Sequence, residues 1–468
     1  MVMRAVSLAE SPSHAMLPLL ALVILHTTEA AYGSGRVAVR SGHTAKHSPA
    51  VEHFPQGTPH HIYRANVTAA EAWTPCHPEA YPPGAWVAKT GGRGGMSSFG
   101  SHLYGTAMTQ RFIWAHQHPS DCTKAKFLLY PPIPSGIGSM FHHMGQALAL
   151  AIELERVMVV AYSPDFPYYS KARCGTGVSF EACYFEPLSS CSWRDALEGV
   201  DRSSMPFINS PSQVTDPNVK TVHFSGAFTA PDYHCQDNSL PPQFHALLRG
   251  SPVEWRKRHY WWRAQSVAYI VRPNARTLAE LVARKRRIYP GHQIRPGTLS
   301  VHVRHGDKHT EKTPVPDQDY LARAEEMARS GAPGQIRQAR QTGQLRQFER
   351  DSQNRQMRWP PMFLSTEDPA TVDFFARQPL WNVSVADVPR KPDANRSTLD
   401  YVAEIGGYEE MLNSLANLDL ALECDAWIGT LSSNWCRLID ELRATVRCKA
   451  HGAYLDAEQD NPPQDLNW

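Results

Sequence analysis

An alternation of short apolar runs with amphipathic stretches, found twice along the chain, is the feature that most constrains the fold. In its first occurrence an apolar run at Lys126–Tyr130 passes through a Pro- and Gly-rich loop into a helical pattern over Met140–Leu154, and a second apolar run follows at Val157–Ala161. Strand, glycine loop, helix and strand in this order make a βαβ unit, and such units build parallel sheets. The sequence therefore predicts an α/β fold.

The second occurrence begins at Leu299–Arg304 and predicts a further, Rossmann-like half. It continues with Met362–Leu364, a helix after Pro369, Val383–Ala386, a helix over Glu409–Glu423, Ala426–Gly429 and a helix after Asn434. Between the two series, helices are predicted over Trp255–Val271 and Asn274–Arg287, interrupted at Pro273 because proline cannot continue a helix. The aromatic and Cys-rich stretch 164–191 is predicted to be a loop.

Length and charge limit the functions open to the chain. Its 468 residues leave room for about three domains of average size (~150 residues). Lys and Arg number 47 and Asp and Glu number 45, so the net charge of +2 provides no cationic excess of the kind that a dedicated nucleic-acid binder uses. Any anionic ligand must therefore be held by local geometry.

The N-terminal region differs in composition from the rest. Met16–Leu25 is an unbroken apolar run that reaches only about 15 Å as a helix, roughly half of a membrane's hydrocarbon core. We therefore expect residues 1–30 to be a signal peptide or a short signal anchor, the alternative being a buried helix. Residues 31–120 are rich in Gly, Pro, His, Ser and Thr, which favours a stem or loosely packed region.

Cysteines and glycosylation sequons favour the secretory pathway. None of the nine cysteines forms a Cys-x-x-Cys pair, which argues against a zinc ribbon or a thioredoxin motif. Disulfides formed in an oxidising lumen fit better, and the odd number leaves at least one thiol unpaired. Sequons begin at Asn66, Asn382 and Asn395, which passage through the lumen would expose to glycosylation.

Three polar segments follow predicted strands, at the end of the sheet where open α/β folds bind ligands. The first, Gly136–His143, places glycines before a helix, so that backbone can approach a ligand closely and free N–H groups can face phosphate oxygens. A simple tight turn is the alternative. His142 and His143 are adjacent and point to different helix faces, which excludes them as a paired metal site.

The second and third segments carry charged and hydroxyl side chains. In His302–Glu311, Arg304 is a fork suited to a diphosphate, Lys308 supplies a second cation and Glu311 is a candidate general base, the alternative being a solvated loop with internal salt bridges. Thr430–Arg437 again joins a strand to a helix. Its Ser433 suits both an N-cap and a phosphate-binding hydroxyl.

An Asp-x-Asp motif at Asp317 and Asp319 has the form of a metal site. Two prolines precede it and a helical stretch over Tyr320–Ala328 follows, so both acids are predicted to lie at a helix N-terminus, where the helix dipole favours them. We therefore expect no metal site and no metal requirement.

Six short motifs occur in order between about Phe127 and Arg447. They comprise Gly136, Gly138, His142 and His143; Phe185, Pro187, Ser189 and Cys191; Trp261, Trp262, Arg272 and Pro273; His302, Arg304, Asp307 and Lys308; Thr366, Asp368 and Pro369; and Ser432, Ser433, Cys436 and Arg437. Together they resemble the core α-1,6-fucosyltransferase family of inverting, GDP-fucose-dependent glycosyltransferases.

This resemblance implies a GT-B-like architecture. An N-terminal open α/β domain on the acceptor side is expected over 121–290, a C-terminal Rossmann-like domain that binds the GDP-sugar over 291–449, and a tail at 450–468. The implied partners are a GDP-sugar and a glycan or glycoprotein acceptor, with no nucleic acid and with membrane contact only through an N-terminal anchor. GDP-fucose would be the donor substrate, with no cofactor. The expected location is the lumen of the secretory pathway, in the Golgi.

Carried over position by position, the resemblance also implies residue roles. Arg304, Lys308 and Glu311 would be catalytic, with Arg304 on the GDP phosphates and the other two at the acceptor hydroxyl. The implied donor-binding residues are Gly136, Gly138, His302, His305, Asp307, Asp368, Ser432 and Ser433. Of these, His302 would lie near the guanine, and no residue is implied as a metal ligand.

The chain departs from the family pattern in three places. His305 stands where the family has a second arginine. The spacing from Lys308 to Glu311 is one residue shorter, and the acid that reads guanine falls near Asn417 or Asp419. We expect transfer of fucose to an N-glycan core GlcNAc in α-1,6 linkage with inversion. The alternatives are transfer to a protein hydroxyl or a cell-wall glycan, and a non-catalytic, secreted glycan-binding relative.

Overall fold

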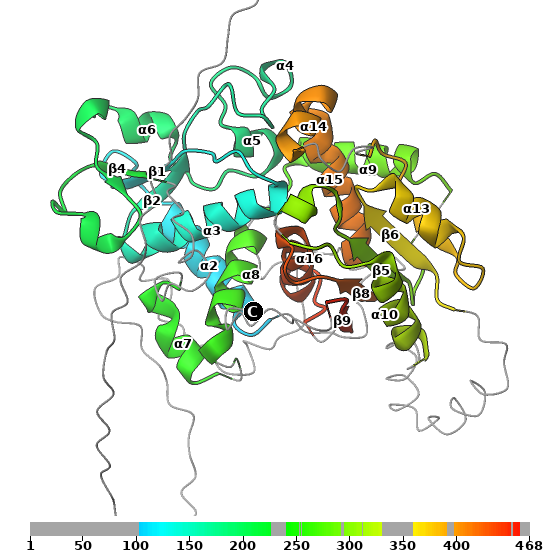
Figure 1. The fold of residues 1–468 in the computed structure, drawn as a ribbon. Coiled ribbons are helices and arrows are strands. Elements are labelled where there is room, and N and C mark those ends of the chain that lie inside the picture. Colours follow the sequence, from blue (N-terminus) through cyan, green and yellow to red (C-terminus); the bar gives the residue numbers. More distant parts are fainter. Residues whose placement is uncertain are drawn as a thin grey trace, which may run out of the picture. The chain divides into compact units, whose positions relative to one another are not determined.

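The strands of this chain form two sheets in a computed structural model, which describes residues 103–225, 240–251, 253, 255–291, 294–310, 312–329, 359–390, 397–450 and 453–458. All strand pairings in both sheets are parallel, and helices separate many of the strands along the chain (Figure 1). The predicted α/β class, with two series of parallel strands, is confirmed, whereas the GT-B-like arrangement stays a prediction. The predicted signal segment at 1–30 and the sequons at Asn66 and Asn395 lie outside the described residues.

The first sheet has four strands in the order β2-β1-β4-β3. The strands are β1 (Phe127–Tyr130), β2 (Val157–Val160), β3 (Phe207–Ile208) and β4 (Thr221–Phe224). Side chains alternate between its two faces: Leu128 packs in a cluster with α3 (Ile137–Glu153), whereas Leu129 packs in a cluster with α6 (Trp193–Leu197). Because both faces are covered, β1 and β2 are continuous apolar runs, which is why the sequence predicted them.

The second sheet has five strands in the order β7-β6-β5-β8-β9. The strands are β5 (Leu299–Val303), β6 (Met362–Thr366), β7 (Val383–Val385), β8 (Ala426–Gly429) and β9 (Tyr454–Asp456). One face packs on α10 (Asp317–Arg329) and α13 (Pro369–Ala376), and the other on α15 (Gly407–Glu423). The strand order changes direction between β5 and β8, which makes their carboxyl ends the topological switch point where such sheets bind ligands.

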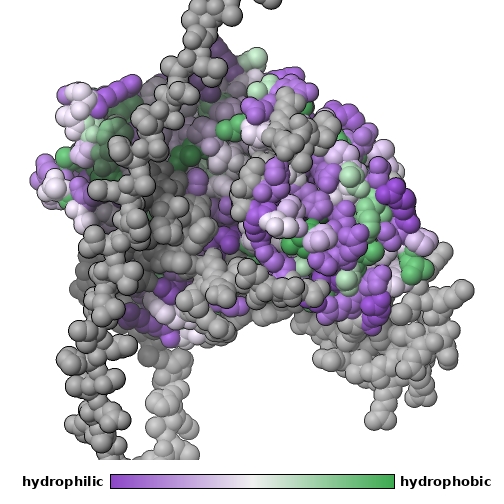
Figure 2. All heavy atoms as spheres, in the orientation of Figure 1, coloured by the Kyte–Doolittle hydropathy of each residue, from purple (hydrophilic) through white to green (hydrophobic). Residues whose placement is uncertain are grey.

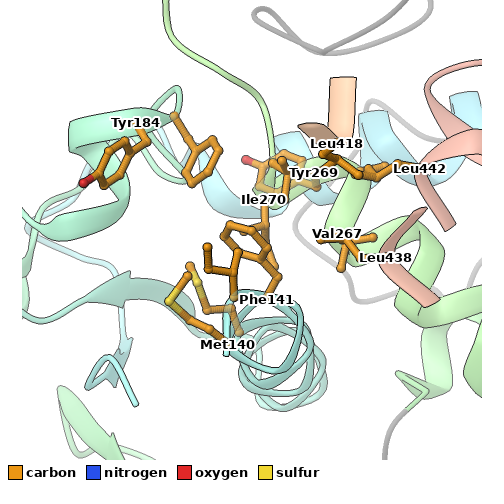
Figure 3. Packing of buried hydrophobic residues seen from close by; sticks show 14 of the residues in the cluster. Met140, Phe141, Tyr184, Val267, Tyr269, Ile270, Leu418, Leu438 and Leu442 are labelled. Carbon is orange, nitrogen blue, oxygen red and sulfur yellow. The ribbon is translucent and has the colours of Figure 1, made fainter. Parts of the chain in front are cut away.

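A shared core joins the two halves. Helix α3 of the first half packs against α8 (Arg258–Ile270) and against α16 (Asn434–Thr445), which follows β8 of the second. Figure 3 shows Phe141, Val267 and Leu438 from these three helices in one buried cluster. Truncating one such aliphatic side chain, as in Leu438→Ala, typically costs 2–5 kcal/mol.

Further short elements complete the described fold. They are α2 (Thr106–Gln117), α4 (Lys171–Cys174), α5 (Phe180–Tyr184), α7 (His245–Arg249), α9 (Ala275–Ile288), α14 (Thr398–Ile405), and the 3₁₀ turns η3 (Arg202–Ser204), η4 (Pro211–Gln213), η7 (Pro242–Phe244), η8 (Trp255–Lys257) and η9 (Gly306–Thr310). Two of them, α4 and α5, lie in the stretch 164–191 that was predicted to be a loop. On the face drawn in Figure 2, hydrophilic side chains predominate over the second half.

Two elements extend beyond the predicted divisions of the chain. Helix α2 falls within the predicted stem at 31–120, and its Gln110 and Gln117 are fully buried because their amides bond to Gln265 O (2.8 Å) and Met158 O (2.9 Å). Buried polar residues of this kind weaken the hydrophobic periodicity. Strand β9 falls within the predicted tail at 450–468 and pairs with β8. That 121–290 and 291–449 are domains remains a prediction.

Two disulfides are present in the described residues, Cys122–Cys191 and Cys174–Cys183. Cys424 and Cys436 are free and buried, and burial raises the pKa of the Cys424 thiol to about 12. Within the described ranges, no helix combines the length and the apolar character that crossing a membrane requires.

Candidate functional site

A cleft lies where the carboxyl ends of β5, β6 and β8 meet the loop that follows β1. Its cavity volume is about 230 Å³, below the ~300–1,000 Å³ of cavities that enclose a drug-sized ligand. A ligand as large as a nucleotide sugar would therefore extend beyond the enclosed part. Seven of the sequence-predicted site residues line the cleft, namely Gly136, Gly138, His302, Arg304, Lys308, Ser432 and Ser433.

Two helices begin at this cleft, α3 from the first half and α16 from the second. Gly136 and Ser433 occupy their N-cap positions, and neither residue caps its helix with a side-chain hydrogen bond. The predicted N-cap position of Ser433 is therefore confirmed, but the capping bond is not formed. The first-turn N–H groups of a helix carry partial positive charge, so two helix starts in one cleft favour an anionic ligand.

Gly138 allows the two helix starts to approach each other closely. A Cβ atom at this position would lie 2.7 Å from the carbonyl carbon of Asn434 and 2.8 Å from its oxygen. With distances this short to backbone, a side chain at this position would force α3 or α16 to shift. The glycine predicted to allow close approach to a ligand thus also allows close approach to α16.

Arg304 follows β5 and meets an acid that follows the neighbouring strand. Its guanidinium is ion-paired with Glu367 and also donates to His305 O at 2.7 Å. Both ion-paired side chains line the cleft and are about one-fifth exposed. Gly306 makes this pairing possible, because its backbone is left-handed (φ +53°) and a Cβ there would lie 2.9 Å from Glu367 Oε1. Arg304 is therefore held in the cleft wall beside a carboxylate, with which an anionic ligand would compete for the guanidinium.

Lys308 lies deeper than Arg304. Its side chain is buried (8% exposed) and its Nζ donates to Ser432 O at 3.3 Å, which links the loop after β5 to the loop after β8. Ser432 Oγ is a buried atom that has no hydrogen-bond partner among the described residues. A ligand oxygen in the cleft could satisfy this hydroxyl.

His302 points into the cleft from the end of β5 as a neutral ring. Its Nδ1 bonds to Ser365 Oγ at 2.9 Å, whereas its buried Nε2 has no partner among the described residues. Burial lowers the pKa of His302 to about 4, with Glu367 opposing the shift. A neutral imidazole with one unpaired nitrogen can donate to or accept from a ligand, depending on its tautomer.

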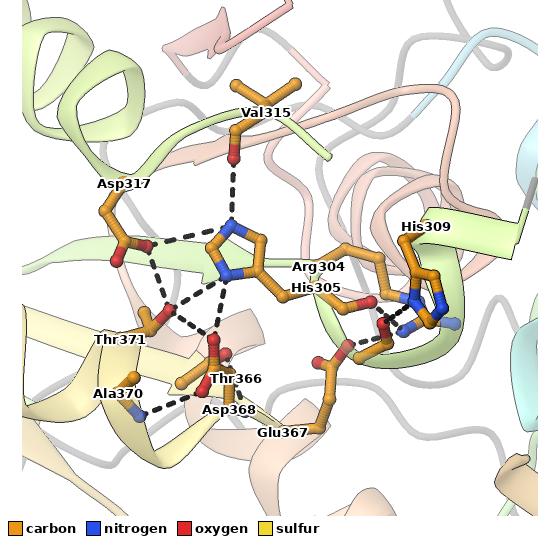
Figure 4. A network of polar contacts seen from close by, with 11 residues as sticks. Arg304, His305, His309, Val315, Asp317, Thr366, Glu367, Asp368, Ala370 and Thr371 are labelled. Carbon is orange, nitrogen blue, oxygen red and sulfur yellow. Dashed lines mark hydrogen bonds and ion pairs between the residues drawn. The ribbon is translucent and has the colours of Figure 1, made fainter. Parts of the chain in front are cut away.

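His305 and Asp368 are not among the residues that line the cleft. They bond to each other through His305 Nδ1 and Asp368 Oδ2 at 3.0 Å, and His305 Nε2 bonds to Val315 O at 2.9 Å (Figure 4). Asp317 lies 3.8 Å from the same ring. Asp368 also caps α13, because its Oδ1 accepts from Ala370 N at 2.8 Å. Both residues thus stabilise the loop ends beneath the cleft.

Of the remaining predicted residues, some line the cleft and others lie away from it. Helix α10 begins at Asp317, as predicted, with Asp319 also in its first turn. Asp307 lies in η9, and Glu311 lies outside the described residues. Of the two positions proposed for a base-reading acid, Asn417 lines the cleft. Asp419 is buried in ion pairs with Lys285 and Arg447 instead.

Sequence reasoning missed most of one wall of the cleft and named only Asn417 from it. Four polar residues of α15 line it, at the helical spacing i, i+3, i+4 and i+7: Glu410, Asn413, Ser414 and Asn417. Arg390 and Tyr401 face the cleft from the chain just before this helix. A polar stripe on an otherwise apolar helix is the signal that could have identified this wall. Glu367 could have been found because it follows β6 as Arg304 follows β5.

Among the described residues, no group of three or more His, Cys, Asp or Glu side chains is arranged to hold a metal ion. The two acids of the Asp-x-Asp motif are not among the cleft-lining residues.

Comparison with known proteins gave distant structural likenesses. No protein-family model matches the sequence. The fucosyltransferase NodZ from Bradyrhizobium is 16% identical over 68% of this chain and 93% of its own, with a TM-score of 0.34. A mutant of Arabidopsis thaliana FUT1 in complex with GDP is 11% identical over 72% of this chain and 73% of its own, with a TM-score of 0.36.

POFUT1 in complex with GDP-fucose is also similar, at 10% identity over 73% of this chain and 100% of its own, with a TM-score of 0.33.

Proposed function

We propose that this protein is a GDP-fucose-dependent glycosyltransferase. The observation that carries the proposal is the convergence, in one cleft, of two uncapped helix N-termini with Arg304 and Lys308. Helix starts and paired cations are the groups that hold a diphosphate. The choice of fucose and guanosine rests on the six motifs, four of which contribute residues to this cleft.

Arg304 is proposed to act on the departing nucleotide. The β-phosphate gains negative charge as the glycosidic bond breaks, so a guanidinium at this point stabilises the transition state more than the ground state. Donor phosphate would displace Glu367 from Arg304 and leave that carboxylate free in the cleft. The buried Lys308 would supply a second fixed cation. This set of charges supports transfer without a metal ion.

The acceptor and the stereochemistry belong to the same proposal. The six motifs support transfer to an N-glycan core GlcNAc in α-1,6 linkage with inversion, in the lumen of the secretory pathway. The two disulfides and the exposed sequon residue Asn382 are consistent with that compartment. Transfer to a protein hydroxyl or a cell-wall glycan would use the same diphosphate site with a different acceptor surface.

A donor and acceptor panel tests the proposal. Calorimetry would measure the binding of GDP, UDP and ADP. A second assay would measure the release of GDP from GDP-fucose, first without an acceptor and then with N-glycans, a protein acceptor or cell-wall oligosaccharides. Tight binding of GDP together with acceptor-dependent release of GDP would support it. Binding of GDP with no turnover on any acceptor would favour the non-catalytic alternative, and failure to bind any nucleoside diphosphate would overturn the assignment.

Glu311 is proposed as the general base. The acceptor hydroxyl must lose its proton as it attacks, which places a carboxylate within about 3 Å of that oxygen in the substrate complex. Glu311→Gln keeps the size of the side chain but removes the base, so kcat should fall by about 100-fold or more while GDP affinity stays within a few-fold. Retained kcat would transfer the role to Glu367, the carboxylate that the structure places beside Arg304.

A further inference from the structure

A buried network of ionisable side chains lies directly behind the two helix starts. His142 of α3 bonds to Glu441 Oε2 of α16 at 2.8 Å, and its other ring nitrogen bonds to Asn434 Oδ1 at 2.9 Å. Arg263 of α8 completes the network, with its Nε 3.4 Å from Glu441 Oε1. Glu441 is completely buried and His142 is 3% exposed. One oxygen of the Glu441 carboxylate thus bonds to His142, and the other lies at ion-pair distance from Arg263 but accepts no hydrogen bond among the described residues.

This network connects the two halves of the chain next to the cleft. His142 lies one helical turn after Gly138, the residue whose missing Cβ lets α3 touch Asn434. Asn434 is the first residue of α16, and its Nδ2 donates to Ser139 Oγ in the first turn of α3 at 2.8 Å. Each helix start is therefore bonded to the other helix, and His142 and Glu441 tie the two helices together one to two turns further on.

A carboxylate without water around it is costly unless its partners are well placed. Nearby packing is apolar, with Phe141 and Leu442 adjacent in sequence to His142 and Glu441 and buried in the core. A shift of α16 relative to α3 would separate Glu441 from His142 and leave a buried charge without this partner. The ion network therefore resists changes in the spacing of the two helices more strongly than apolar contacts, which tolerate small slips.

We propose that Glu441, His142 and Arg263 are positioning residues that set the spacing of the two helix N-termini, and so the geometry of the diphosphate site. None of the three lines the cleft. The inference rests on the proposed function, because it assigns the spacing a role in holding the donor diphosphate. Since the two helix starts follow strands of different sheets, the network makes one rigid anion site from both halves of the fold.

Glu441→Gln and Asp440→Asn form a matched pair for the test. Asp440 is the neighbouring acid on α16, but it accepts from Tyr260 Oη at 2.8 Å and from Trp427 Nε1 at 3.1 Å, on α8 and β8, and has no such bond to α3. Both changes replace a hydrogen-bonded carboxylate by an amide. Only the first alters the link between the two helix starts.

The readout is the dissociation constant of GDP, measured by calorimetry at a temperature where thermal unfolding shows each variant to be folded. We expect Glu441→Gln to raise this constant by about tenfold or more, which is the loss in affinity seen when residues that orient metal ligands are replaced. Asp440→Asn should change it by less than about twofold. Equal affinity of the Glu441→Gln variant and the unaltered protein would overturn the inference. Absence of GDP binding by the unaltered protein would instead overturn the proposed function, and the inference with it.

A double-mutant cycle separates positioning from general loss of stability, and its single variant His142→Gln is the test if Glu441→Gln does not fold. His142→Gln keeps a polar side chain but cannot bond to both Asn434 and Glu441. If the two residues act through one network, the double variant should bind GDP no more weakly than the worse single variant. Multiplicative losses would contradict a shared network. If Glu441→Gln does not fold, unchanged GDP affinity in a folded His142→Gln variant would overturn the inference.

Discussion

The two halves of the molecule bring different chemistry to one cleft. The first half contributes mainly backbone, from Gly136 to Ser139 at the start of α3. The second contributes charged side chains, with Arg304, Lys308 and Glu367 at strand ends. Backbone dipoles cannot titrate or move independently, whereas charged side chains can exchange partners. Changes in the first half should therefore mainly alter the spacing of the two helix starts. Changes in the second half should mainly alter turnover and the response to pH.

Removing the cation of the second half should have the largest effect. Arg304→Ala leaves the growing phosphate charge without its guanidinium, so we expect turnover to fall by about 100-fold or more, corresponding to ~3 kcal/mol by analogy with a lost oxyanion donor. Transfer of fucose from GDP-fucose measures this. Arg323→Ala, which breaks a surface ion pair with Glu326 on α10, is the control and should leave turnover unchanged. Near-normal turnover in folded Arg304→Ala would contradict the assigned role.

Substitution by alanine should have very different effects at two glycines of the first half. Gly138→Ala places a methyl group 2.7 Å from Asn434 backbone, whereas Gly136→Ala meets nothing within 4 Å. We expect Gly138→Ala to cost about 1–3 kcal/mol of stability by overpacking and to weaken GDP binding, and Gly136→Ala to change stability by less than about 0.5 kcal/mol. Chemical denaturation and calorimetry measure the two effects. Equal stability and equal GDP affinity of the two variants would show that neither depends on the close contact between α3 and α16.

A pH dependence of stability should come from the second half. Burial lowers the pKa of His305, but its bonds to Asp368 and Val315 O and the nearby Asp317 outweigh burial and raise the pKa above its usual 6.5. The native state then holds a proton that the unfolded chain releases, so this stabilisation is complete below about pH 6.5 and is lost as the pH rises through the raised value.

The free energy of unfolding, measured between pH 6 and 9, should therefore fall with rising pH by on the order of 1 kcal/mol or less. His305→Asn should flatten this part of the profile while leaving the contribution of other groups in place. An unchanged slope in His305→Asn would assign the dependence to another group.

Chelation should have the smallest effect. If Arg304, Lys308 and the two helix starts supply the positive charge, EDTA should leave turnover within about twofold, since no metal is asked to neutralise the leaving diphosphate. The assay compares turnover before and after EDTA, with and without added Mn²⁺. Activity that is lost with EDTA and restored by Mn²⁺ would return Asp317 and Asp319 to consideration as ligands.

Sequence reasoning succeeded best where burial is continuous. The runs that became β1, β2, β5 and β8 are apolar because parallel strands are covered on both faces, so they were visible without the structure. It failed for β3 and β9, which have two and three residues and so too little pattern to detect. Helix α2 was not detected because it buries two glutamines, whose amide nitrogens bond to partners distant in the chain.

By itself, the sequence determined the two series of strands and helices and the placement of Gly138, Arg304 and Ser433 at strand ends. Local periodicity and turn residues carry that information, because neighbours in the chain share one helix or strand. Only the tertiary structure decided which of these residues meet. His302 turns into the cleft while His305 bonds beneath it to Asp368.

The sequence also could not predict the ion network, because its members are far apart in the chain. His142 and Glu441 are 299 residues apart, and no spacing in the chain links them. Their contact depends on how α3 and α16 pack, which is set by the summed burial of both halves in one core. Pairing of this kind follows from the fold as a whole, since each partner is a plain helical residue until the other half is in place.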